Sequence, residues 1–200
     1  MEYNHPLDDP KYYYDLGFAF SGLGKYEDAI KAYTTDIEKY NNYGALENRA
    51  FCYAQIGNRR QAISDYEKAH DRIMEKIHAY ENVDDPRRKP YLKDLVRVQC
   101  YIGELSMQMQ SFEDARTYYQ CAILNCERYP EVLPEELNMT LLYANSAFAN
   151  MQLQDLELAA SDFAGSLKNS KSPVEKQQIE MAINYAGLGE AVKRYMNNNR

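Results

Sequence analysis

A spacing of small and aromatic residues recurs four times along the chain and constrains its fold more than any other feature. A glycine or alanine is followed twelve residues later by an alanine, and four residues after that by an aromatic ring. The four sets are Gly17–Ala29–Tyr33, Ala50–Ala62–Tyr66, Gly103–Ala115–Tyr119 and Ala147–Ala159–Phe163. Because small residues let two helices approach closely, this spacing predicts four helical hairpins.

Apolar residues between these positions recur with helical period, and the sequence contains neither an alternating strand pattern nor an Asn-Gly turn. Most prolines stand between the periodic stretches. The pattern therefore predicts an all-α fold, with helices at 11–23, 26–40, 43–56, 59–81, 91–109, 112–128, 135–153, 156–168, 174–188 and 190–196. Gly24 and Gly57 fall between paired helices, where a left-handed backbone suits glycine.

The hairpin pattern resembles the tetratricopeptide repeat, a helix–turn–helix unit with the pattern W-x2-L-G-x2-Y, then A-x3-F, then P. The first unit reads Tyr13-x2-Leu16-Gly17-x2-Phe20, then Ala29-x3-Tyr33. The second unit matches as well, whereas the third and fourth hold mainly at their small residues, and the closing proline is missing from the first three. The resemblance implies a right-handed α-solenoid of helical hairpins.

The predicted solenoid is a single domain over residues 1–200. Its repeats are expected at 10–42, 43–82, 91–129 and 135–173, with a partial fifth at 174–196. The fifth is suggested by "YAGLG" (185–189), which echoes "YAQIG" (53–57). Ala29 and Ala62 lie 33 residues apart, but Ala62 and Ala115 lie 53 apart, so extended helices are expected after the second repeat.

Charge and cysteine usage exclude several classes of protein. The chain has 23 Lys and Arg against 30 Asp and Glu, a formal net charge of −7, which argues against nucleic-acid binding because phosphate contacts need basic side chains. No apolar run approaches the roughly 20 residues of a membrane span, and no signal peptide is visible. The cysteines have neither metal-ligand nor secreted-scaffold spacing, which predicts reduced packing residues of a cytoplasmic protein: Cys52, Cys100, Cys121 and Cys126.

No residue pattern indicates catalysis, and we expect no enzyme, metal or cofactor site. His70 and His78 lie eight residues apart on one predicted helix, too far to chelate one metal, and His5 lies in the leading segment. Phosphate loops, Gly-x-Ser-x-Gly elbows and Cys/His signatures are missing from the sequence.

The resemblance implies a protein-interaction module, because members of this family take peptides or partner helices in a concave groove lined by the first helix of each hairpin. The expected groove residues are Tyr14, Phe18, Asn48, Phe51, Arg97, Tyr101, Glu104, Asn145 and Phe148. An asparagine amide both donates and accepts, so it can pair with any peptide group, and phenylalanines supply apolar anchors. The basic clamp of chaperone-tail-binding members is missing, since only Arg97 carries a positive charge at its positions.

Two alternatives remain open at this point. One is a regulatory domain whose groove senses a short peptide or small effector. The other is a scaffold that assembles into homo-oligomers through its terminal repeats. We also expect Gly17→Leu to overpack the first hairpin and Gly17→Ala to be tolerated, because alanine occupies the same place in the second and fourth units.

Overall fold

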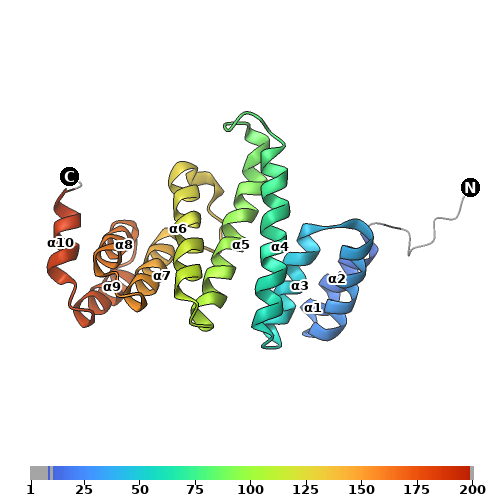
Figure 1. Cartoon of the computed structure of the whole chain (residues 1–200), viewed down its shortest axis with the longest axis horizontal. Helices are drawn as coiled ribbons and strands as arrows, with labels where there is room; N and C mark the ends of the chain where they lie inside the picture. The colour runs from blue at the N-terminus through green and yellow to red at the C-terminus, as the bar shows by residue number, and fades with distance from the viewer. Residues whose placement is uncertain (1–8, 10, 199–200) are drawn as a thin grey trace, which may run out of the picture. The chain divides into compact units, whose positions relative to one another are not determined.

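The computed structural model describes residue 9 and residues 11–198, and over this part the chain forms ten α-helices, two 3-10 helices and no strand (Figure 1). The α-helices are α1 (Tyr12–Gly22), α2 (Tyr26–Tyr40), α3 (Tyr43–Gln55), α4 (Arg59–His78), α5 (Lys89–Gln108), α6 (Phe112–Arg128), α7 (Met139–Gln152), α8 (Leu156–Asn169), α9 (Pro173–Tyr185) and α10 (Gly189–Asn198), and the 3-10 helices are η2 (Pro86–Arg88) and η3 (Pro130–Val132). The predicted all-α fold of sequential hairpins is confirmed.

The chain divides into two compact units, unit 1 over residues 1–81 and unit 2 over residues 82–200. In unit 1, α1 pairs with α2 (hairpin 1) and α3 with α4 (hairpin 2), and α3 also packs on α2. In unit 2, α5 pairs with α6 (hairpin 3) and α7 with α8 (hairpin 4), and α7 also packs on α6. The extra length lies in α4 and α5, which have 20 residues each against 15 in α2.

Helix boundaries follow the sequence closely, because they depend on local capping groups. Helices α2 and α6 begin and end at the predicted residues. The largest difference is at α7, which was expected from residue 135 and begins at Met139. Asn138 caps this helix by accepting a hydrogen bond from the Leu141 N–H at 2.7 Å, and asparagine is a preferred residue for that role.

All four hairpin turns have the same backbone conformation. The residue at the turn has a positive φ, +71° at Gly24, +78° at Gly57, and +61° at both Gln110 and Gln154. In the first turn the Lys25 N–H donates to the carbonyl five residues back at 2.9 Å, which is a Schellman arrangement. Glycine marks the first two turns in the sequence, but glutamine has no preference for a left-handed backbone, so residue type does not reveal the other two.

Gly17 is buried at the contact between α1 and α2, as predicted. A Cβ atom added to Gly17 would lie 2.7 Å from two carbon atoms of the Tyr33 ring, and Tyr33 is fully buried. Gly17→Ala therefore requires the buried Tyr33 ring to shift, a cost that the expectation of tolerance did not include. Gly103 meets the Tyr119 ring in the same way, with the added Cβ at 2.9 Å.

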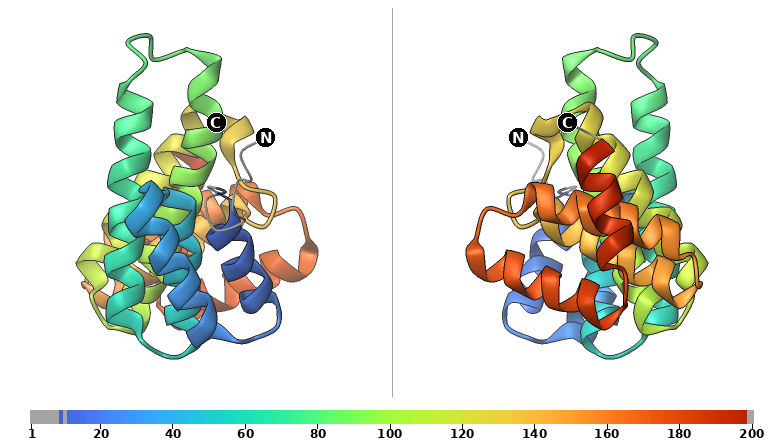
Figure 2. Two further views of the ribbon diagram at one scale, coloured as in Figure 1. Left: turned by 90° about the vertical axis from the view of Figure 1, so that its right-hand side faces the viewer. Right: turned by 90° about the vertical axis from the view of Figure 1, so that its left-hand side faces the viewer.

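The last two helices differ from the four hairpins. Gly187 has φ +69° and forms the same turn, with the Leu188 N–H donating to the Ile183 carbonyl at 3.0 Å. In each hairpin the residue seven positions before the turn residue is glycine or alanine, but here it is Glu180. Helices α9 and α10 contact each other little, and α10 packs against α8 instead (Figure 2). The "YAGLG" echo is thus two residues out of register with the turn, which uses Gly187 rather than Gly189.

Candidate functional site

Four of the predicted groove residues lie on α1 and α3 in unit 1. The Asn48 amide donates a hydrogen bond to the Tyr14 hydroxyl at 3.0 Å. Phe18 is 64% exposed and Phe51 is 41% exposed, and the Phe51 ring meets Tyr26 edge-on at 6.3 Å between centroids. Because α1 and α3 are in contact, unit 1 presents two exposed aromatic rings from neighbouring first helices.

The other five predicted residues lie on α5 and α7 in unit 2. Phe148 is 39% exposed and packs edge-on against the buried Phe163 at 5.6 Å. Arg97 is engaged in an ion pair with Asp94 at 2.6 Å, so its charge is already matched. The remaining predicted residues of this unit are the exposed Glu104 and the half-buried Tyr101 and Asn145.

The two predicted asparagines form hydrogen bonds between hairpins that the sequence did not reveal. Asn48 of hairpin 2 bonds to Tyr14 of hairpin 1. Burial raises the pKa of Tyr119 on α6 of hairpin 3, and a hydrogen bond from Asn145 of hairpin 4 lowers it in part. Each amide therefore joins two successive hairpins within its unit. One groove that holds all nine residues stays a prediction.

An apolar hollow lies between α7 and α9 in unit 2, with a volume of about 330 Å³. Its lining includes Phe148, which the sequence predicted, together with residues it did not predict: Asn138, Thr140, Leu141, Ala144, Phe163, Glu175, Gln178, Ile179 and Ala182. Sequence reasoning missed the α9 wall because it treated the helix expected at 174–188 only as the start of a partial fifth repeat. No local signal in the sequence marks its actual position.

A second hollow of about 190 Å³ adjoins the first and shares three of its residues, Asn138, Thr140 and Glu175. The rest of its lining comes from the segment that leads into the first residue of α7 and from the end of α8 with the turn that follows it: Leu133, Leu137, Met139, Asn169 and Lys171. Glu175 thus stands where the two hollows meet.

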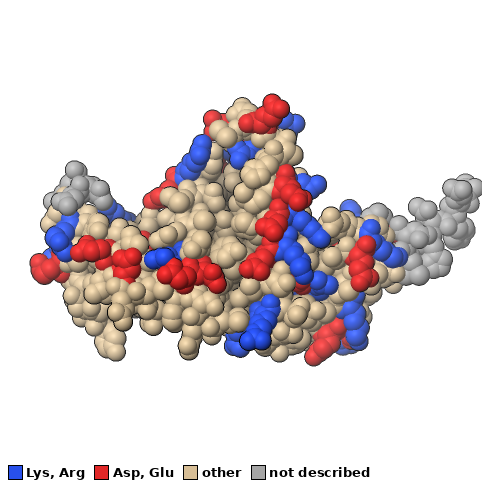
Figure 3. All heavy atoms as spheres, in the orientation of Figure 1, with Lys and Arg blue, Asp and Glu red and all other residues tan. Residues whose placement is uncertain are grey.

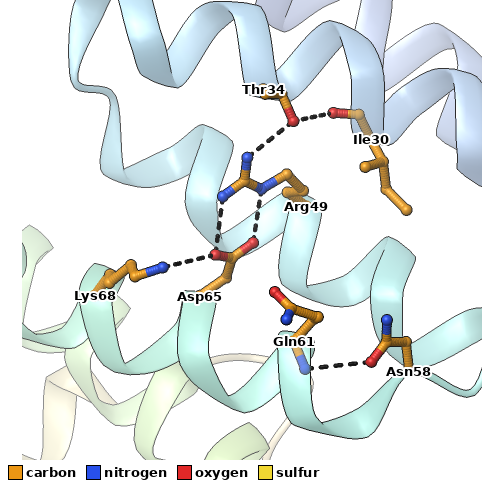
Figure 4. Close-up of polar contacts among 7 residues, drawn as sticks. All are labelled: Ile30, Thr34, Arg49, Asn58, Gln61, Asp65 and Lys68. Carbon is orange, nitrogen blue, oxygen red and sulfur yellow. Dashed lines mark hydrogen bonds and ion pairs between the residues drawn. The ribbon is translucent and has the colours of Figure 1, made fainter.

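A polar network ties three helices of unit 1 together (Figure 4). Arg49 on α3 donates two hydrogen bonds to Asp65 on α4, at 2.7 and 2.9 Å, and a third to the Thr34 hydroxyl on α2 at 2.8 Å. Burial works to lower the pKa of Arg49, but the hydrogen bonds and charge of Asp65 outweigh it and raise that pKa above its ordinary value. The network is structural, since both groups are matched and largely buried.

The equivalent position in hairpin 4 holds a different polar cluster. The Ser146 hydroxyl and the Asn150 amide both donate to one oxygen, Oδ2 of Asp162, at 2.6 and 2.8 Å. Burial raises the pKa of the Asp162 carboxyl, and the two hydrogen bonds offset only part of that rise. The hydrogen-bond donors to the Asp162 carboxylate are thus both neutral, whereas Asp65 pairs with the charged Arg49.

Within the described residues, no group of three or more His, Cys, Asp or Glu side chains is placed to hold a metal ion. His70 lies 3.3 Å from the neighbouring Asp71 and His78 is exposed, while His5 lies outside the described residues. No helix in the described part of the chain is long and apolar enough to cross a membrane. On the face drawn in Figure 3, basic and acidic side chains are interspersed.

Comparison with known proteins agrees with the hairpin pattern. Residues 10–35 match the family described as the tetratricopeptide repeat. No curated protein sequence matches the chain.

Many solved structures match the chain, and two of them illustrate the shared fold. The MamA protein is 17% identical with a TM-score of 0.65, over 94% of this chain and 88% of that one. BtubC (BKLC) from P. vanneervenii is 16% identical with a TM-score of 0.62, over 98% of this chain and 81% of that one. At these identities the likeness shows the fold alone.

Proposed function

Because this chain is a tetratricopeptide-repeat protein by its sequence pattern and its fold, we propose that it is a protein-interaction module. It binds a peptide or helical segment of a partner protein along the first helices of its hairpins. One observation carries this proposal: the residue after the small contact residue is an exposed phenylalanine in hairpins 1, 2 and 4, namely Phe18, Phe51 and Phe148.

The three exposed phenylalanine rings offer apolar surface that a partner can cover. A large aromatic ring that stays exposed in the free protein gains free energy when a partner covers it, at about 25 cal/mol per Å² of apolar surface. Aromatic side chains are also enriched among residues that dominate interface energies. The mechanism is equilibrium binding without chemical change, and it requires no cofactor.

The proposal also covers the compartment of the module, which is the cytoplasm, and the class of its partners, which is protein. Cys52, Cys100 and Cys126 are buried and unpaired, and Cys121 is also free. Burial raises the pKa of Cys126 to about 11, so its thiol stays protonated and unreactive. Free packing cysteines fit a cytoplasmic protein, and the net charge of −7 favours protein partners over nucleic acid or membrane surfaces.

The test compares affinity capture by the wild-type chain with capture by two variants. Phe18→Ser with Phe51→Ser removes the rings of unit 1, and Phe148→Ser removes the ring of unit 2. Leu124→Ser is the matched control, because Leu124 is an exposed apolar residue on α6, a second helix. Partners should bind at least about tenfold more weakly to the phenylalanine variants. If the control loses partners and the phenylalanine variants keep them, the first-helix surface is not the binding surface.

A second candidate function, self-assembly, is favoured by the outer face of α9. Val174, Met181 and Tyr185 lie along one stripe of this helix and are exposed, Tyr185 to 94%. A second copy of the chain that covered this stripe would bury three apolar side chains. Sedimentation over a range of concentrations separates the two functions, since Met181→Ser with Tyr185→Ser should abolish any self-association and leave partner binding unchanged.

A further inference from the structure

We propose that the hollow between α7 and α9 selects partner segments in which a bulky apolar side chain lies within one helical turn of a lysine or arginine. Glu175 is the residue that sets this preference. The inference rests on the proposed function and deepens it, because it names the chemistry of the partner segment that unit 2 accepts.

The hollow is built to take a single large apolar group. Its volume of about 330 Å³ is at the small end of the 300–1,000 Å³ range of ligand sites. Leu141 and Phe148 form the α7 wall and Ile179 belongs to the α9 wall. Two alanines, Ala144 on α7 and Ala182 on α9, also line it, and their small side chains leave the room that a partner side chain would fill.

The charge of the lining gives the occupant its second feature. Glu175 is the only charged residue among those that line this hollow. Among the described residues its carboxylate has no ion pair within 4.0 Å, although Lys171 lines the adjoining hollow four residues earlier. A lysine or arginine of the partner would therefore meet a carboxylate that no protein cation has matched. A charge-assisted hydrogen bond of this kind is about twice as strong as a neutral one.

The polar residues around Glu175 support the same occupant. Gln178 lines the hollow beside it, and its amide oxygen can accept a further hydrogen bond from a lysine or arginine. The remaining wall is apolar apart from Asn138 and Thr140. A partner with a bulky apolar side chain and an acidic neighbour would place two carboxylates together, which is unfavourable.

The experiment selects binders from a random peptide library displayed on phage, with the full chain as bait. Three variants are tested with the peptides recovered. Glu175→Lys reverses the charge at the hollow, Ala182→Phe fills the hollow, and Glu180→Lys is the control, since Glu180 is exposed on the opposite side of α9. Ala144→Phe fills the hollow from α7 if Ala182→Phe fails to fold by circular dichroism.

We expect peptides with leucine or an aromatic residue close to lysine or arginine. They should bind at least about tenfold more weakly to Glu175→Lys and to the filled variant, and equally to Glu180→Lys. Selection on Glu175→Lys should shift the consensus toward acidic residues. If peptides bind but the filled and charge-reversed variants bind them as the wild type does, the inference is wrong and the proposed function stands. If no peptide and no partner protein binds to any surface, both fail.

Discussion

Hairpins 2 and 4 have an aspartate at the same position, and the two are held in different ways. Asp65 is 1% exposed and faces the guanidinium of Arg49, which is 14% exposed. Asp162 receives hydrogen bonds from two neutral donors, Ser146 and Asn150. In both hairpins the donor stands sixteen residues before the aspartate, on the first helix.

The comparison shows what this position in a hairpin requires. In hairpin 1 the equivalent pair is Leu16 and Ala32, which line a common hollow, and in hairpin 3 it is Ile102 and Tyr118. The position thus accepts an ion pair, a carboxylate with neutral donors, or two uncharged side chains. The two side chains at this position, one from each helix, must either pair with each other or both lack charge. A buried polar group without a partner would lose its hydration without compensation.

The largest effect is expected for Asp65→Asn in hairpin 2. The substitution leaves the buried Arg49 guanidinium without its hydrogen-bonded counter-ion, and breaking a buried pair in this way costs about 3–5 kcal/mol. Urea unfolding followed by circular dichroism measures the loss, and hydrogen exchange should localise it to α3 and α4. A loss under about 1 kcal/mol would show that solvent reaches Arg49 and that the two hairpins differ less than their contacts indicate.

Most of that loss should be recovered when both partners are replaced together. Arg49→Leu with Asp65→Ala copies the apolar pair of hairpin 1 and removes both buried charges. Such replacements are often neutral or stabilising, so we expect a free energy of unfolding within about 1 kcal/mol of the wild type. A double variant as unstable as Asp65→Asn would contradict the inference that the two helices need only a matched pair at this position. The ion pair would then have a role beyond charge neutralisation.

A smaller effect is expected at the turns of the same two hairpins. Gln154 has a positive φ where hairpin 2 has Gly57, and a left-handed backbone costs a residue with a Cβ about 1–2 kcal/mol. Since glycine also loses more entropy on folding, Gln154→Gly should stabilise the chain by up to about 1 kcal/mol. Gly57→Ala is the reciprocal variant, and thermal melts of the two should move in opposite directions.

The smallest effect at neutral pH is expected for Asp162→Asn, and its sign is opposite to that of Asp65→Asn. Both donors reach a single oxygen of Asp162, so an amide carbonyl can accept both bonds. Burial raises the pKa of Asp162 above its ordinary value, so the native state holds the proton more tightly than the unfolded chain. Stability is therefore lost as pH rises from about 4, the ordinary pKa of aspartate, through the raised pKa.

Asparagine carries no charge at any of these pH values and should remove that loss. Urea unfolding between pH 4 and pH 8 should show a smaller fall in stability for Asp162→Asn than for the wild type, with the variant at least as stable at pH 7. A variant that is less stable than the wild type across the whole range would mean that the charge of Asp162 stabilises hairpin 4.

Most of the fold could be predicted from residue spacing. The small residues at twelve-residue intervals, with an aromatic ring four residues on, locate all four hairpins. Less of the candidate site could be predicted from the sequence. Phe18, Phe51 and Phe148 are exposed as a surface role requires, but Arg97 is matched by Asp94, a partner that spacing alone did not single out.

The sequence by itself determined the helices and the pairing of the first four hairpins, because these depend on apolar period, capping groups and contacts between residues close in the chain. Only the tertiary structure decided how Arg49 and Asp162 are matched and where α9 lies. "YAGLG" predicts a fifth hairpin, yet Glu180 takes the place of the small contact residue, and α10 packs on α8 instead. Such choices depend on how well two distant surfaces fit, and the hollow beside Glu175 exists because α9 and α7 do not close on each other.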